Sequence, residues 1–258
     1  MFTVVIILMA VLLFLMMQLD TRRTRISNYQ WTEDMLTENS VAQTRAFEAT
    51  LSGQYSILDL LAAGVAVQDE INIESILPYT SAATQSTNFL HIVLDLPDGS
   101  ATMDNGTKTN VSDRKYFIQA MKGSRSIEQV ADAKIESGRR VILAVPIIKD
   151  SQVVGVLHGS YSETLLRKLL VSDNENRSSY TFLCDSDGEI IVGSDNESFS
   201  TVGNNLFSMI ETDGKRESPE IDQARKNLLE GIGGSLIYST DRGERFAVYT
   251  PLDLLDSK

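Results

Sequence analysis

The chain has 258 residues, a hydrophobic fraction of 42% and a formal net charge of −12 at pH 7. This length fits one large domain or two small ones, and the hydrophobic fraction is ordinary for a packed core. The negative charge argues against nucleic acid as a partner, because phosphates attract lysine and arginine. It suits a surface that faces water. Cys184 is the only cysteine, so the chain cannot form an internal disulfide.

The first segment, Met1 to Met17, is apolar except for Thr3. About 17 residues is the lower bound for spanning the hydrocarbon core of a bilayer, and we expect a transmembrane helix over residues 1–19. A secretory signal peptide is the alternative, but the segment has no basic region before it and no cleavage site of small residues. The arginines that follow, at 22, 23 and 25, would by the positive-inside rule alone place the rest of the chain in the cytoplasm.

Residues 20–70 carry the pattern of one long stalk helix, which Asp20 and Thr21 can cap at its start. Along its second half, apolar residues recur at spacings of three and four, which is one face of a helix. They are Phe47, Leu51, Tyr55, Leu58, Ala62 and Val65. This stripe predicts core packing. The section from Thr32 to Thr44 is polar almost all round, which fits either a stalk or one half of a dimer stem.

A second, short helix is predicted over Ile71–Leu77, ending at Pro78 because proline disrupts a helix interior. From Phe89 the pattern changes to strands. Alternating apolar residues predict a strand around Leu90, Ile92 and Leu94. Asp98 and Gly99 then supply a hairpin turn.

The stretch from Val111 to Tyr161 is predicted to form a short helix followed by a three-strand antiparallel meander. The helix has one apolar face, and Gly123 ends it. That face consists of Tyr116, Phe117, Ala120 and Met121. Two of the strands alternate around Val141–Val145 and Val153–Leu157, and Asp150 and Ser151 form the turn between them.

Two parts of this sequence recur further along the chain, which indicates a duplicated α+β module. Leu94–Gly99 reads L-D-L-P-D-G, and Leu183–Gly188 reads L-C-D-S-D-G. Gly138–Ile147 and Gly243–Leu252 place their glycine and proline at the same separation. The repeat predicts a second hairpin, with strands at 181–184 and 190–192 around an Asp-Gly turn.

The second copy is shorter than the first. After Pro146 the first copy continues with the strand Val153–Tyr161, whereas only Leu252–Lys258 follow Pro251. We therefore expect the second sheet to lack its last strand and to have an unpaired edge. This predicts a truncated gene product or a fragment.

Three motifs in this order resemble the core of Cache sensor domains, the extracytoplasmic ligand-binding modules of bacterial chemoreceptors, sensor kinases and membrane-bound diguanylate cyclases. They are S-D-R-K-Y-F (Ser112–Phe117), A-V-P-I (Ala144–Ile147) and G-V-L-H-G-S (Gly155–Ser160). Together with the repeat, the resemblance implies the double Cache layout. This is an α+β fold in which a long N-terminal helix precedes two PAS-like modules with antiparallel sheets, the second of them incomplete.

The same resemblance implies the domain organisation and the location of the chain. A transmembrane helix over 1–19 and a stalk over 20–70 would lead to a membrane-distal module over 71–170 and a membrane-proximal module over 171–258. The bulk of the chain would then lie outside the cytoplasm, attached to the cell membrane by one N-terminal helix. This contradicts the positive-inside rule, and a true N-terminus upstream of Met1 would reconcile the two.

A ligand site in the distal module is also implied by the resemblance. In double Cache receptors for amino acids, an Arg-x-Trp-Tyr element holds the ligand carboxylate, and Arg114, Tyr116 and Phe117 match it with conservative changes. Asp132 falls near a later tyrosine of that motif, and Ser160 falls near the aspartate that holds the amine. These five residues are the predicted ligand-binding set. Because the amine clamp is altered, the implied ligand is a small anionic molecule rather than an α-amino acid.

The residue types alone leave simpler roles open for this set. Arg114 could form a structural ion pair with Asp113 or Asp132, because a guanidinium pairs with any nearby carboxylate. Tyr116 and Phe117 could be core residues. Asp132 and Ser160 could be solvated positions or parts of a hairpin.

No catalytic residue, metal ion or cofactor is predicted. Asp185–Gly188 resembles part of a calcium loop but lacks acids in the remaining positions. His91 and His158 lie within strand patterns and are expected to pack rather than to react. The spacing does not exclude a Ser-His-Asp triad, but the G-x-S-x-G element that would support one is missing from the sequence.

The sequence therefore predicts the sensory region of a membrane receptor rather than an enzyme. A small ligand would bind in the distal module and shift the long helix by population shift between two states. An output domain such as a diguanylate cyclase or histidine kinase would lie outside this chain, and the long helix could form a homodimer. The alternatives are a secreted or membrane-anchored hydrolase and an orphan fragment without a ligand.

Overall fold

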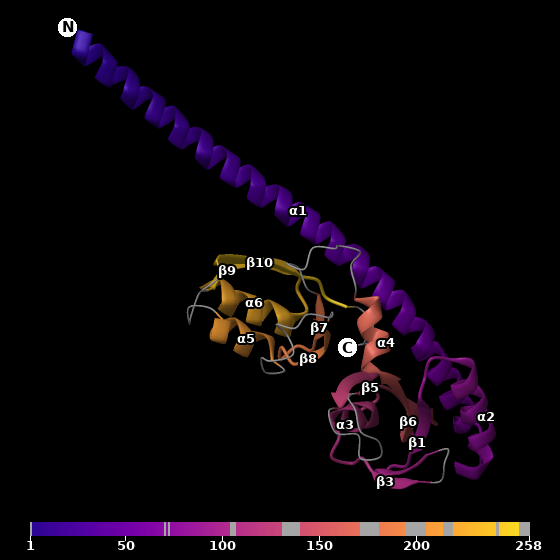
Figure 1. Ribbon diagram of the computed structural model, residues 1–258. Helices are drawn as coiled ribbons and strands as arrows, with labels where there is room; N and C mark the ends of the chain where they lie inside the picture. The colour runs from indigo at the N-terminus through magenta and orange to yellow at the C-terminus, as the bar shows by residue number, and fades with distance from the viewer. Residues whose placement is uncertain are drawn as a thin grey trace.

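The fold is α+β, with one long helix followed by two modules that contain antiparallel sheets, as predicted (Figure 1). Figure 1 is a computed structural model. It describes residues 2–69, 71, 73–103, 107–130, 140–170, 181–193, 205–213, 219–240 and 243–252. In the figure, α1 runs diagonally across the molecule, and both modules lie along one side of it.

Helix α1 (Phe2–Ala66) is continuous over 65 residues. It does not begin at Asp20, because nothing in this part of the sequence interrupts a helix: the first proline of the chain is Pro78. The predicted apolar stripe is confirmed, since all six of its residues are buried. Within the described residues, we find no helix whose length and hydrophobicity would allow it to cross a bilayer.

The first module is built on one six-stranded antiparallel sheet in the order β3-β2-β1-β6-β5-β4. The strands are β1 (His91–Asp95), β2 (Ser100–Thr102), β3 (Lys108–Asn110), β4 (Ser126–Val130), β5 (Arg140–Lys149) and β6 (Gln152–Ser162). Because side chains alternate along a strand, the sheet has two different faces. One face packs against the apolar stripe of α1, and the other packs against α3 (Lys115–Met121).

The predicted helix and meander are confirmed. In α3, Tyr116, Phe117 and Ala120 are buried, and Gly123 follows the helix with a φ of +94°. Strands β4, β5 and β6 are neighbours in chain order, and Asp150 and Ser151 join β5 to β6 with φ values of 51° and 63°. Two successive residues with positive φ form the kind of tight turn that matches the twist of a hairpin.

Helix α2 (Ile73–Ser86) differs from the prediction because it continues through Pro78. The backbone bond that this proline removes would have gone to Glu74, in the first turn, so only one hydrogen bond is lost near the helix end. Beyond Pro78, buried Thr80 and partly buried Ala83 continue the packed side of the helix. Tertiary packing therefore outweighs the local signal. A short helix, α4 (Glu163–Leu169), follows β6 and ends the described part of the first module.

The described residues of the second module form two helices and four strands. The helices are α5 (Leu206–Asp213) and α6 (Pro219–Glu230), and the strands are β7 (Phe182–Cys184), β8 (Ile190–Gly193), β9 (Gly234–Thr240) and β10 (Gly243–Tyr249). The strands form two separate pairs, β7 with β8 and β9 with β10. In the first module, β6 lies between β1 and β5. Among the described residues of the second module, no strand takes that place between β7 and β10, and the incomplete second sheet stays a prediction.

The two predicted Asp-Gly hairpins are held by the same set of hydrogen bonds, which supports the internal repeat. In the first, the Asn110 side chain donates to the Asp98 carbonyl, and the next residue donates its N–H to the Gly99 carbonyl. In the second, Asn205 donates to the Asp187 carbonyl at 3.1 Å, and the next residue donates to the Gly188 carbonyl. Both glycines have φ near +80°, where a side chain would be strained.

Candidate ligand site in the first module

The sheet face under α3 combines an apolar floor with an unusual number of polar side chains. Val93, Ile142, Ala144 and Val156 form the apolar part of this face. Alternation along the strands places a group of polar residues on the same side. It includes Asp95, Ser126, Glu128, His158 and Ser160, and also His91 of β1 and Arg140 of β5.

Two hydrogen bonds fix α3 to strand β4 at the edge of this face. The Glu128 carboxylate accepts the backbone N–H of Tyr116 at 2.7 Å. The Ser126 hydroxyl donates to the Tyr116 carbonyl at 2.9 Å. Arg114 stands at the N-cap position of the helix in an extended conformation, with φ −84° and ψ 136°. The start of α3 is therefore held at a defined height above the sheet.

A buried histidine-aspartate pair lies beneath Tyr116. Nδ1 of His158 lies 2.7 Å from Oδ2 of Asp95, and the Asp95 side chain is fully buried. The Tyr116 ring packs against the His158 ring, with centroids 5.0 Å apart. Burial raises the pKa of Asp95, and the adjacent His158 opposes this shift. Because Oδ2 takes the hydrogen bond of Nδ1, the other ring nitrogen of His158 is the one left for further contacts.

Buried polar atoms without a hydrogen-bond partner among the described residues occur on this face. Oδ1 of Asp95 is one, and the hydroxyl of Ser160, whose residue is 4% exposed, is another. Leaving such a group unsatisfied costs about 1–3 kcal/mol, so native proteins rarely tolerate it. Each of these atoms is a position at which a bound polar molecule can make a hydrogen bond. They are therefore the strongest local indication of a ligand site.

Charges of both signs surround the hydroxyl of Tyr116. Burial is the main reason why its pKa is raised; Asp95, Glu128 and Asp113 raise it further, and Arg114 lowers it. Arg114 stands just before α3, and Tyr116 in the first turn packs on the His158 ring that is bonded to Asp95.

The predicted site residues are only partly gathered in one place. Tyr116 and Phe117 are buried between α3 and the sheet, as their core-packing interpretation expects, and Tyr116 also borders the polar cluster. Ser160 lies on the same sheet face, and Arg114 begins the helix above it. Asp132 lies outside the described residues. A ligand contact of any of these five residues stays a prediction.

Sequence reasoning missed Asp95 and Glu128 as members of this cluster. The signal for Asp95 was an acidic residue at the end of the otherwise apolar run Ile92–Leu94, where a buried carboxylate needs a partner. His158 was expected to pack, and it is buried against Tyr116. Its partner could not be read from the sequence, because 63 residues separate it from Asp95.

The serine, histidine and aspartate of this face do not form a hydrolase triad in the described structure. A triad needs the serine hydroxyl hydrogen-bonded to the histidine that the aspartate orients. Here His158 is bonded to Asp95, but the Ser160 hydroxyl has no partner among the described residues. The geometry gives no support to the hydrolase alternative.

Several solved structures share this fold. The ligand-binding domain of the Pseudomonas fluorescens chemoreceptor CtaA, in complex with L-serine, matches with a TM-score of 0.66 and 19% identity over 87% of this chain and 92% of that chain. The ligand-binding domain of the Pseudomonas aeruginosa amino acid chemoreceptor PctB, in complex with L-Arg, gives 0.65 and 19% over 87% and 83%. The sensory domain of the Campylobacter jejuni chemoreceptor Tlp3, with isoleucine bound, gives 0.58 and 16% over 88% and 91%.

The sequence matches no family model, and no curated protein matches it. The identities to the solved structures are low, so these comparisons bear on the fold alone. They agree with the order of elements described above and with the resemblance found in the motifs. The chain has the double Cache fold of chemoreceptor sensory domains.

Proposed function

We propose that this chain is an extracytoplasmic sensory region that binds a small molecule between α3 and the six-stranded sheet of its first module. The observation that carries the proposal is the pair of unsatisfied buried atoms, Oδ1 of Asp95 and the Ser160 hydroxyl, under a helix that begins with Arg114. A ligand would supply the missing hydrogen bonds. The similar solved domains, whose titles name bound L-serine, L-Arg and isoleucine, support a binding role rather than catalysis.

The proposed ligand carries an anionic group that pairs with Arg114. A guanidinium binds a carboxylate through two parallel hydrogen bonds. Tyr116 and Phe117 would form the wall of the site, and Ser160 would hydrogen-bond a polar group of the ligand. Because a serine stands where amino acid receptors of this fold place an acid, a carboxylate without an amine should bind as well as the matching amino acid.

A thermal shift screen tests this proposal, since a ligand of the native state raises the melting temperature by mass action. Propionate, lactate and L-alanine form one suitable series, because they differ only in the group beside the carboxylate. We expect stabilisation that does not depend on the amine. Stabilisation by amines without a carboxylate, and by no acid, would contradict an anionic ligand.

Arg114→Ala is the matching variant. We expect it to weaken binding of the stabilising acid by about 10- to 100-fold, the size of a charged hydrogen-bonded contact, and to leave unfolding cooperative. Lys122→Ala is the control, because Lys122 is an exposed cation at the other end of α3. If Arg114→Ala instead unfolds the module, then Arg114 has the structural role that its residue type left open.

Signal transmission through α1 is part of the same proposal. The apolar stripe of α1 covers the sheet face opposite the candidate site, so a change in the sheet would reach this helix directly. Membrane attachment through residues 1–19 and a homodimer through α1 stay predictions. Crosslinking of single-cysteine variants along the exposed side of α1, in a Cys184→Ser background, would test the dimer.

A further inference from the structure

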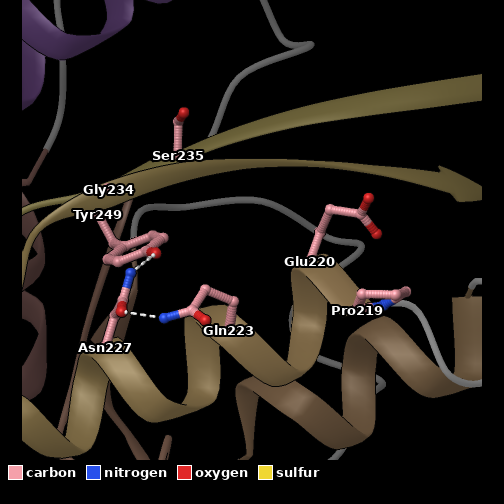
Figure 2. A pocket seen from close by; sticks show the side chains of 7 residues that line it. All are labelled: Pro219, Glu220, Gln223, Asn227, Gly234, Ser235 and Tyr249. Atoms are coloured by element: carbon pink, nitrogen blue, oxygen red, sulfur yellow. Dashed lines mark hydrogen bonds between the residues drawn. The ribbon is translucent and has the colours of Figure 1, made fainter.

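The second module contains a cavity of about 380 Å³ between helix α6 and strands β9 and β10 (Figure 2). The pocket is open to solvent, because four of its lining residues, Pro219, Glu220, Gln223 and Ser235, are exposed. Seven residues line it: Pro219, Glu220, Gln223, Asn227, Gly234, Ser235 and Tyr249. The candidate site described above lies in the other module, so this cavity is a separate feature of the molecule.

The internal repeat places this cavity on the face that corresponds to the candidate site of the first module. Aligning Gly138 with Gly243 matches Ala144 of β5 to Tyr249 of β10. Ala144 pairs with Ser126 across its sheet, and Tyr249 pairs with Gly234. In the first module this position faces α3, and in the second it faces α6. Both modules therefore have a helix above the same part of the sheet.

Polar side chains in the cavity are held in a fixed arrangement. The Asn227 amide donates to the Tyr249 hydroxyl at 2.8 Å, and the Gln223 amide donates to the Asn227 side-chain oxygen at 2.8 Å. Figure 2 shows this chain of side chains crossing from α6 to β10. Gly234 is needed for it, because a Cβ there would lie 2.5 Å from the Tyr249 hydroxyl oxygen. Such ordering before binding lowers the entropy cost of holding a ligand.

The charge of the cavity is negative. Among the described residues that line it, Glu220 is the charged one. A second carboxylate lies at the rim, because the Ser235 hydroxyl donates to Glu33 of α1 at 2.8 Å. With two carboxylates, an amide pair and a phenol hydroxyl, the surroundings favour a cation that donates hydrogen bonds.

We propose that this cavity is a second ligand site, selective for small organic amines, with Glu220 as the residue that pairs with the ammonium group. Tyr249 and Gln223 accept hydrogen bonds from the same ligand. The site is independent of the anion site proposed for the first module. Because Glu33 belongs to α1, an amine bound here would also contact the long helix.

Isothermal titration calorimetry of the whole chain with 1,4-diaminobutane tests this proposal. We expect one bound diamine per chain, and no binding of 1,4-butanediol, which has a similar length but lacks the positive charge. Glu220→Gln should weaken binding about tenfold, because it removes the charge and keeps the shape. Tyr249→Phe should weaken it as well, and thermal unfolding of both variants reports whether the module is intact.

Asp222→Asn is the matched control, because Asp222 is an exposed acid on the same helix that does not line the cavity. It should change the affinity less than about twofold, as expected for an exposed charge. Arg114→Ala should leave diamine binding unchanged, which separates this site from the one in the first module. The proposal is overturned if the diamine does not bind, if the diol binds equally well, or if Asp222→Asn weakens binding as much as Glu220→Gln.

Discussion

Removing the hydroxyl of Tyr55 should show how strongly hydrogen bonds connect the long helix to the candidate site. Tyr55 of α1 is fully buried, and its hydroxyl donates to the backbone carbonyl of Ser126 at 2.9 Å. Ser126 in turn donates its own hydroxyl to the Tyr116 carbonyl of α3. Two hydrogen bonds through Ser126 therefore connect α1 to β4 and β4 to α3, directly beside the polar cluster.

Tyr55→Phe keeps the ring in place and removes only the donor. The Ser126 carbonyl would then be buried without the partner it has now, which costs about 1–3 kcal/mol, and the variant creates no cavity. We expect the free energy of unfolding of the first module to fall by about 1–2 kcal/mol. By comparison, Leu58→Ala, which empties a fully buried site on the same stripe, should cost about 2–5 kcal/mol.

Urea denaturation followed by far-UV circular dichroism measures both losses. The midpoint should shift while the m-value stays constant, because neither variant changes the surface exposed on unfolding. Thr50→Ala is a suitable control, since the Thr50 hydroxyl bonds only within its own helix and is exposed. A change below about 0.3 kcal/mol for Tyr55→Phe would mean that the buried carbonyl finds another donor. The proposed connection from α1 through Ser126 to the candidate site would then have no energetic support.

Two further predictions follow from close packing and from burial. Gly159→Ala should destabilise the first module by about 1–3 kcal/mol in the same assay, because its Cβ would lie 2.3 Å from the Phe89 ring; a neutral effect would show that Phe89 can move. Burial raises the pKa of Cys184 to about 12, so its thiolate is scarce at pH 8 and alkylation by iodoacetamide should be about 1,000-fold slower than for a free cysteine. The rate should rise about tenfold per pH unit up to that pKa, and fast labelling at pH 8 would refute the raised pKa.

The turns and the amphipathic helices of this protein could be read from the sequence. Gly99, Gly123, Asp150 and Ser151, which lie at the predicted turns and helix end, all have positive φ angles. The stripe of α1 and the apolar face of α3 are buried as their spacing indicates. These features depend on neighbouring residues and on the period of a helix or strand, so a local reading of the chain is sufficient.

The candidate site could be read only in part. The resemblance to a known family pointed to Arg114 and to the residues after it, and the fold puts them beside a polar cluster. The buried members of that cluster were not found, because a carboxylate or imidazole in a strand gives no signal of which distant strand will lie beside it. The predicted end of α2 at Pro78 was also wrong, because packing of the residues beyond Pro78 keeps the helix intact.

Sequence by itself determined where the chain turns, which faces of its helices are apolar, and which two hairpins resemble each other. Only the tertiary structure decided that β6 pairs with β1, which brings His158 to Asp95 across 63 residues. It also decided that Asn110 and Asn205 hold equivalent hairpins. The physical reason is range: dihedral preferences and periodicity act within a few residues, whereas strand order and burial arise from the packing of the whole chain.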